Sequence, residues 1–107
     1  MNDTSLQLPA GAEHYVLRLY VTGSTQRSTR AIETTREICD AYLKGHHDLE
    51  VIDLYLNPAA AALGQIVAAP TLVRVLPEPL RRIIGDLSDR PRVLAGLGLA
   101  GQAAATS

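Results

Sequence analysis

The chain has 107 residues, 47% of them hydrophobic, and a formal net charge of −1. This length is typical of a single domain with one core. The near-neutral charge argues against a general nucleic-acid or membrane-surface binder, because such proteins carry an excess of basic side chains.

The single cysteine, Cys39, excludes an internal disulfide and a two-cysteine redox motif. No segment approaches the roughly 18 apolar residues of a membrane span, and residues 1–11 lack the basic and apolar regions of a signal peptide. We therefore expect a cytoplasmic protein with a flexible arm at 1–12, one domain at 13–99 and a flexible tail at 100–107.

The first half of the chain predicts a strand, a helix and a second strand. Residues 14–22 place apolar side chains on both alternating faces, which indicates a strand in the interior of a sheet. A helix is expected from about Thr25 to Leu43, because apolar residues recur there at steps of three and four. The second strand is expected at 49–56.

The second half predicts a short helix, a hairpin and a closing helix. An alanine-rich helix is expected at 58–67, followed by hairpin strands at 71–76 and 80–84. Ser88 is a suitable N-cap for a last helix that continues to about Leu97. The order is therefore βαβαββα, and the crossover helix makes the first two strands parallel. We predict an α/β fold class and a single domain of thioredoxin-like topology.

The C-terminal third also fits a different assignment. Helical spacing is found at Leu80, Ile83, Ile84 and Leu87. Residues 93–99 alternate like a strand, with Gly96 and Gly98 between the apolar positions. A glycine inside a helix costs about 1 kcal/mol relative to alanine, so the closing helix is weak. Two interpretations remain open: the ordinary ambiguity of short apolar segments, or a switch between two packings of similar free energy.

Motifs for catalysis and metal binding give a mostly negative result. Thioredoxin-like oxidoreductases place a reactive thiol in the loop after the first strand, but residues 23–28 contain no cysteine. A glutathione site of the transferase type could instead use Ser24, Thr25, Pro70 and Ser88. We expect no helical second domain to complete that site. The tract His46-His47-Asp48 lacks the spacing of a metal site. We therefore expect no catalytic residue, no metal and no cofactor.

A resemblance to the KaiB family of circadian clock proteins lies in four segments: YVLRLYVTGST at 15–25, VIDLYLNP at 51–58, APTLVRVLPEPLRRIIGDLSDR at 69–90 and VLAGLGL at 93–99. The similarity to the family runs without gaps from Tyr15 to about Leu99, and the motif APTL…LPxPxRxIIGDLS is specific for this family. The resemblance implies a protein without chemistry of its own that binds the N-terminal ring of the clock ATPase KaiC. Binding would change KaiC phosphorylation and ATP turnover.

The resemblance also implies two packings of the chain. KaiB proteins bind KaiC in a thioredoxin-like state. In the well-studied cyanobacterial members the free protein rests in a different state, often tetrameric, in which the C-terminal half is rearranged; the order βαββααβ is the corresponding alternative packing. Residues implied in this switch are Pro70 (which matches the thioredoxin cis-proline), Gly85, Asp86, Gly96 and Gly98. Residues implied in partner binding are the basic surface positions Arg30, Arg74 and Arg81, together with Asn57 and Gln65 at the alanine-rich helix.

Several positions depart from the family pattern. Gln65 stands where cyanobacterial members commonly have lysine, Gly98 replaces an aspartate, and the acidic C-terminal tail is missing. Such a sequence resembles the KaiB homologues outside cyanobacteria, in which the partner KaiA is often absent. The N-terminal sensor domain of the KaiC-binding kinase SasA shares the implied fold.

The expected partners are therefore a KaiC-like ATPase, further copies of the chain in a dimer or tetramer, and KaiA or a SasA-like kinase as a competitor. The alternative functions are a stress-response adaptor that binds another protein and, less favoured, a glutathione-binding enzyme.

Overall fold

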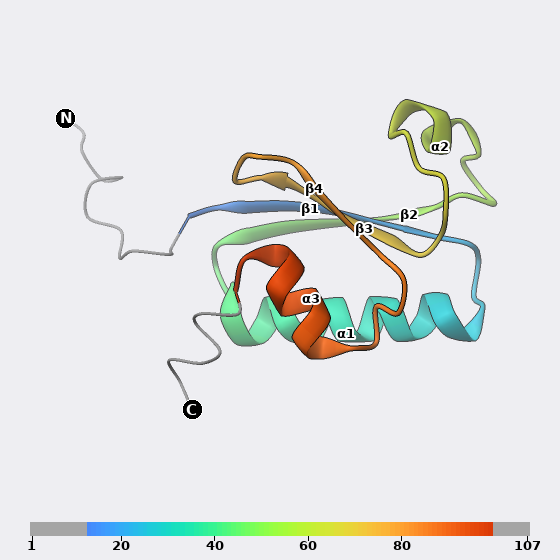
Figure 1. Ribbon diagram of the computed structural model, residues 1–107. Helices are drawn as coiled ribbons and strands as arrows, with labels where there is room; N and C mark the ends of the chain where they lie inside the picture. The colour runs from blue at the N-terminus through green and yellow to red at the C-terminus, as the bar shows by residue number, and fades with distance from the viewer. Residues whose placement is uncertain (1–12, 100–107) are drawn as a thin grey trace.

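The computed structural model describes residues 13–99, so the predicted arm at 1–12 and tail at 100–107 lie outside the described residues. The order of helices and strands is the predicted one (Figure 1). The elements are β1 (Tyr15–Val21), α1 (Gln26–Tyr42), β2 (His47–Asp53), α2 (Ala59–Leu63), β3 (Thr71–Leu76), β4 (Arg81–Ile84) and α3 (Arg90–Leu97). The predicted α/β class is confirmed.

The sheet has the strand order β2-β1-β3-β4. β1 lies in the interior, as its two apolar faces predict, and pairs in parallel with β2 and antiparallel with β3. β4 continues the sheet as the antiparallel partner of β3. Helices α1 and α3 lie together on one face of the sheet, whereas α2 lies beyond the opposite face, near the end of β2 (Figure 1). This arrangement is the thioredoxin-like topology.

The core lies between the sheet and helices α1 and α3. Its large side chains are mostly aliphatic, because the chain has no Phe and no Trp, and Tyr15 is the aromatic member of the buried cluster. They include Leu17, Leu19, Ile38, Leu72, Val93 and Leu97. Burying one such side chain contributes about 1.5–3 kcal/mol. Cys39, which the helix pattern places on the buried stripe, is 1% exposed and belongs to this core.

The end of β2 differs from the prediction. The strand ends at Asp53 and not at Leu56. The carboxylate of Asp53 accepts a hydrogen bond from the Tyr55 backbone N–H at 2.9 Å. Its backbone carbonyl accepts from the N–H groups of Leu56 and Asn57 at 3.1 and 2.9 Å. These local bonds satisfy groups that would otherwise extend the ladder, so the chain turns out of the sheet.

The alanine-rich helix is also shorter than predicted. α2 covers five residues, Ala59–Leu63, and not 58–67. Gly64 forms its C-cap, and its N–H donates to the Ala60 carbonyl. Gln65 follows with a positive φ of 57°, a left-handed conformation in which a right-handed helix cannot continue.

The C-terminal half adopts a strand followed by a helix, with two differences from the expected capping. Asp89, and not Ser88, is the N-cap of α3, because its carboxylate accepts from the Arg92 N–H at 3.3 Å. Gly98 lies outside the helix as its C-cap, with a φ of 80° that favours glycine. Of the two glycines expected to weaken the helix, only Gly96 therefore lies inside it.

Candidate partner-binding surface

The connection between β2 and β3 exposes most of the large apolar surface in residues 13–99. Four of the seven large hydrophobic side chains that are exposed there belong to this connection: Tyr55 at 70%, Leu56 at 84%, Leu63 at 87% and Val67 at 91%. Within the described chain, α2 itself contributes no buried residue. A helix that buries no apolar face gains little from packing, and exposed apolar side chains gathered in one region mark an interaction site. We name these four residues, with Asn57 and Gln65, the α2 surface.

The base of the α2 surface is fixed to the loop after β1. The Asp53 carboxylate accepts from the Gly23 N–H at 3.0 Å as well as from Tyr55. Gly23 has a φ of 63°, and a Cβ atom there would lie 2.8 Å from the Tyr55 ring. Glycine is required at this position for both reasons. The Tyr55 ring is therefore held in place although most of it faces solvent.

A second set of contacts holds α2 over the open face of the sheet. The hydroxyl of Tyr20 packs so closely on Gly64 that a Cβ atom there would lie 2.6 Å from it. Arg82, on β4, donates to the Gly64 carbonyl and to Gln65 Oε1, both at 3.4 Å. The position of α2 therefore depends on β1 and on β4.

The predicted partner-binding residues fall in different places. Asn57 and Gln65 lie at the two ends of α2 and are both exposed. Arg30 lies on α1 and Arg81 on β4, exposed but outside the connection that carries α2. The structure thus brings two of the five residues together.

Arg74 is not at the surface, and this part of the sequence prediction is wrong. Its side chain is 6% exposed and points toward α3, where it donates to the carbonyl groups of Leu97 and Pro79. The surface position was what the resemblance to the KaiB family implied, and a buried arginine is rare in proteins generally.

The predicted switch residues form two groups. Pro70, Gly85 and Asp86 come together at the start of α1 and α3, where Pro70 and Asp86 line a shallow pocket with Arg27, Arg30, Leu87 and Ser88. Pro70 follows a cis peptide bond, as its match to the thioredoxin proline implies. Gly96 and Gly98 lie at the other end of α3.

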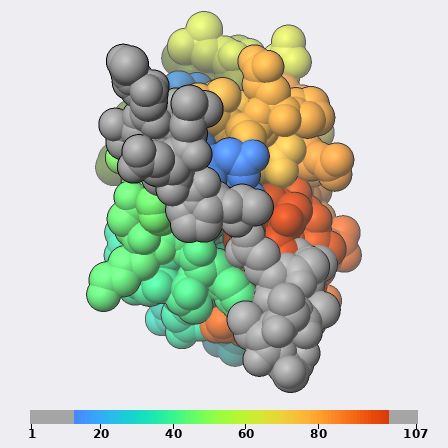
Figure 2. Space-filling model, turned by 90° about the vertical axis from the view of Figure 1, so that its left-hand side faces the viewer, coloured from blue at the N-terminus to red at the C-terminus, as the bar shows by residue number. Residues whose placement is uncertain are grey.

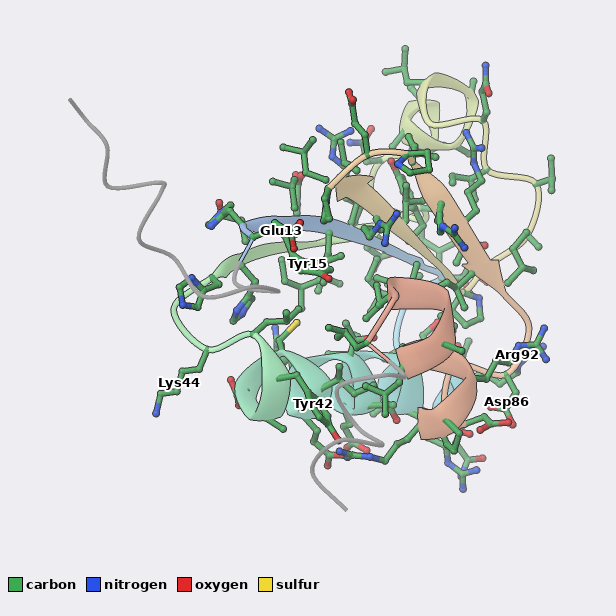
Figure 3. The ribbon with its side chains drawn as sticks, turned by 60° about the vertical axis from the view of Figure 1, so that its left-hand side comes forward. Glu13, Tyr15, Tyr42, Lys44, Asp86 and Arg92 are labelled. Carbon is green, nitrogen blue, oxygen red and sulfur yellow. The ribbon has the colours of Figure 1, made fainter. Side chains whose placement is uncertain are left out.

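Asp86 has the most distinct electrostatic setting of this group. Its carboxylate accepts hydrogen bonds from the side chain and the backbone N–H of Ser88. These bonds, with a smaller attraction from Arg27 and Arg30, lower the pKa of the Asp86 carboxyl below its ordinary value of 3.8. Asp86 lies near Arg92 at the start of α3 (Figure 3). Arg92 in turn donates to the Ile84 carbonyl at 2.9 Å.

The loop that carries the thiol in oxidoreductases serves here to start α1. Thr25 is the N-cap and accepts from the Ser28 N–H at 3.2 Å, while the Ser28 hydroxyl accepts from the Thr22 N–H at 3.1 Å. Burial raises the pKa of the Cys39 thiol to about 11, so the thiol is protonated at neutral pH. Neither hydroxyl nor thiol is set up as a nucleophile.

Potential metal ligands are scattered in the part of the chain that the structure describes. No three His, Cys, Asp or Glu side chains between residues 13 and 99 lie close enough to share a metal ion. His14 bonds to Asp48 at 2.8 Å, and His47 Nδ1 bonds to the Leu43 carbonyl at 2.8 Å. No helix in the same range has the length and apolar character needed to cross a membrane.

The exposed apolar residues of the α2 surface were not singled out from sequence. Tyr55 and Leu56 continue the apolar run of β2, so the sequence pattern predicts them as part of the strand. The signal that could have separated them is Asp53, a residue type that favours turns and is depleted in strands.

Comparison with known proteins gives one consistent family. Residues 18–99 match the model of the KaiB domain. The circadian clock oscillator protein KaiB of Prochlorococcus marinus strain SARG is 55% identical over 85 residues, which are 79% of this chain and 73% of that protein. KaiB of P. marinus strain MIT 9312 is 51% identical over 90 residues, 84% of this chain and 86% of that protein.

Solved structures with a similar backbone agree with this result. The N-terminal domain of SasA from Synechococcus elongatus superposes with a TM-score of 0.62 and 25% identity, over 94% of this chain and 90% of that domain. Mitochondrial thioredoxin 3 of Saccharomyces cerevisiae, in its oxidized form, superposes with a TM-score of 0.65 and 16% identity, over 80% of this chain and 78% of that protein. The thioredoxin comparison concerns the fold alone.

Proposed function

This chain belongs to the KaiB family, and from that membership we propose that it is a non-enzymatic clock regulator that binds the ring of a KaiC-like ATPase. Binding changes the phosphorylation and the ATP turnover of the ATPase. The relatives are named circadian clock oscillator proteins, which supports the clock role. We place the protein in the cytoplasm, with its partner.

The observation that carries this proposal is the exposed α2 surface. Tyrosine is one of the residue types that supply most of the binding energy at the centre of an interface, and the side chains around it contribute by excluding water. Here Leu63 and Val67 are about nine-tenths exposed, at 87% and 91%. Their burial against a partner removes apolar area from water, at about 25 cal/mol per Å² before the losses of entropy on association. Because Asp53 and Gly23 hold the base of this surface, little further ordering is needed there when the partner docks.

The resemblance of the fold to the SasA domain suggests competition. Two domains of one topology that bind the same ATPase ring would exclude each other from it. We propose that a SasA-like kinase competes with this chain, and that KaiA, where present, is a further partner. Free copies of the chain assemble into a dimer or tetramer, with the C-terminal half in a second packing.

The remaining partner-binding assignments are part of the same proposal. Arg30 and Arg81 are exposed and able to meet carboxylates of the partner. Asn57 and Gln65 flank the apolar residues and supply polar contacts at their rim. Gln65 accepts a hydrogen bond from Arg82, whereas a lysine there would place two positive charges side by side.

Two other functions remain as alternatives. A stress-response adaptor would use the same apolar surface for another protein, so the identity of the partner decides between the two. A glutathione enzyme is less favoured, because the Asp86 carboxylate bonds to Ser88 and would repel the carboxylate of glutathione there. The Thr25 hydroxyl is also engaged as a helix cap.

The decisive experiment measures binding of the chain to the cognate KaiC-like ATPase with ATP, by size exclusion and by interferometry over several hours. The double variant Leu63→Ser/Val67→Ser should bind at least about tenfold more weakly, since both side chains are exposed and their loss leaves the fold stable. Leu80→Ser is the control for loss of an exposed apolar side chain outside the α2 surface, because Leu80 is 46% exposed and lies in the turn between β3 and β4.

Two results would contradict the proposal. The unmodified chain forms no complex at micromolar concentration, or the double variant binds as tightly as the control. In the first case, a complex recovered with a different protein and lost in the double variant would favour the adaptor.

A further inference from the structure

Arg74 carries a charge that is buried without a matching carboxylate among residues 13–99. The side chain is 6% exposed. Among residues 13–99 the contacts between basic and acidic side chains are His14–Asp48, Arg18–Glu50 and Arg90–Glu37, and none of them includes Arg74. Its Nε has no hydrogen-bond partner in the same range. A buried guanidinium is unfavourable unless hydrogen bonds compensate for the lost water, so the bonds it does make decide its effect.

Those bonds join three segments of the C-terminal half. Nη1 donates to the Leu97 carbonyl in the last turn of α3 at 3.1 Å, and Nη2 donates to the Pro79 carbonyl in the turn before β4 at 2.8 Å. Arg74 itself belongs to β3. Figure 2 shows the β3–β4 hairpin (orange) next to α3 (red) on the face where these segments meet.

The bond to α3 acts at a helix terminus. The last carbonyl groups of a helix have no partner within the helix and carry a partial negative charge. The cation of Arg74 meets one of them, and Gly98 leaves room for it, since a Cβ atom there would lie 3.1 Å from Nη1. Arg74 therefore stabilises α3 as a helix that ends at Leu97.

The hydrogen bonds of Arg74 are linked to the α2 surface through β4. The turn at Pro79 precedes β4, and Arg82 on β4 donates to Gly64 and Gln65 beside α2. Both acceptors of Arg74 exist together when residues 81–84 form a strand and 90–97 a helix. If residues 93–99 formed a strand instead, the helix carbonyl that Arg74 binds would be lost.

We infer that Arg74 is an internal clamp that favours the arrangement of the C-terminal half seen here, and that it affects partner binding through this arrangement and not through contact. It is a positioning residue. The inference deepens the proposed function and rests on it where binding is concerned, but the clamp itself is tested on the free chain, so the two can fail separately.

The test compares Arg74→Met with Arg81→Met by hydrogen exchange of the free full-length chain. Arg81 is the cross-strand neighbour of Arg74 and is exposed, so it loses the same charge without a buried bond. In Arg74→Met the amides of Gly98 and Leu99, which bond to Ala95 and Leu94, should exchange at least about tenfold faster. In Arg81→Met they should stay within about twofold of the unmodified chain.

Amides of β1 serve as the internal reference. If Arg74→Met exchanges faster throughout the chain, Arg74→Lys is compared instead, because an ammonium keeps the charge but offers one nitrogen to the two carbonyls. Its faster exchange should then be confined to the β3–β4 turn and the end of α3. Equal acceleration in β1 would overturn the clamp.

Partner binding gives the second readout. Unchanged exchange in Arg74→Met together with lost binding would also overturn the inference, since Arg74 would then act as a contact. Faster exchange at α3 supports it whether or not the partner proves to be a KaiC-like ATPase.

Discussion

The N-terminal and C-terminal halves of the sheet are held together by different means. β1, α1 and β2 have 7, 17 and 7 residues, and β1 is paired with β2 along its whole length. β4 and α3 have 4 and 8 residues. β1 and α1 bury apolar side chains along their length. β4 and α3 bury only Ile83, Val93, Leu94 and Leu97, and they depend in addition on a few contacts that require a particular residue.

Three such contacts define the C-terminal half. A Cβ atom at Gly96 would lie 2.6 Å from the Ile83 side chain, so glycine lets α3 approach β4. Arg92 donates to the Ile84 carbonyl at 2.9 Å, and Arg74 joins α3 to the hairpin. Because these contacts add to a smaller set of buried side chains, one side chain changes the C-terminal half more readily than the N-terminal half.

The largest effect is expected from removing core volume in the N-terminal half. Ile38 is 0% exposed, so Ile38→Ala should lower the free energy of unfolding by about 2–5 kcal/mol, measured in urea. Alkylation of Cys39 should accelerate in parallel, since its thiol is buried and its pKa is raised to about 11 in the folded state. Ile32→Ala, at a half-buried position of the same helix, should lose less. Equal losses would show that burial does not hold this half.

A smaller and local effect is expected in the C-terminal half. Gly96→Val forces α3 away from Ile83 and should lower stability by about 1–3 kcal/mol. Hydrogen exchange should accelerate in α3 and β4, while alkylation of Cys39 stays slow. Ala95→Val is the control, because Ala95 is the exposed neighbour in the same helix and loses only helix propensity, about 0.5 kcal/mol. The contrast between the halves would be wrong if Gly96→Val accelerated Cys39 alkylation as strongly as α3 exchange.

The same contrast explains how far the sequence could be read. The bounds of β3 were predicted as Thr71–Leu76, as found, and α1 differs by one residue at each end. Such elements are defined by periodicity over a long segment, or by a short apolar run that turn residues bound on both sides. The closing helix was ambiguous because its pattern also fits a strand. What decides it, the fit of Gly96 against Ile83 and the bonds of Arg74, joins residues that are distant in sequence.

Errors at the candidate site have the same origin. Ser88 and Asp89 are both good N-caps, and Asp89 is chosen because Ser88 already bonds to Asp86. The resemblance implies a surface position for Arg74, and nothing in the local sequence indicates the Leu97 and Pro79 carbonyl groups that accept its hydrogen bonds. The exposure of Leu63 and Val67 could not be predicted either, because an apolar residue in a short helix is expected to pack.

The smallest effect is expected at Asp86, between β4 and α3, and it depends on pH. The pKa of its carboxyl is lowered in the folded state, first by the hydrogen bonds from Ser88. The charged form therefore stabilises the fold above the ordinary pKa of 3.8, and this stabilisation is lost as the pH falls through the lower folded value. In urea titrations, Asp86→Asn should unfold earlier than the unmodified chain at neutral pH, and the difference should shrink as the carboxyl becomes protonated below its lowered folded-state pKa.

Salt and two control variants identify the cause of the Asp86 effect. High salt screens Arg27 and Arg30 but leaves the Ser88 hydrogen bonds, so most of the difference at neutral pH should survive it. Ser88→Ala should remove part of the difference, and Glu78→Gln controls for the loss of one exposed carboxylate. If the difference disappears in high salt, the arginines of α1 are the main cause, and the turn between β4 and α3 is tied to the N-terminal half by charge. If the difference survives in high salt, Asp86 acts through hydrogen bonds within its own turn, and the C-terminal half is stabilised by its own polar contacts.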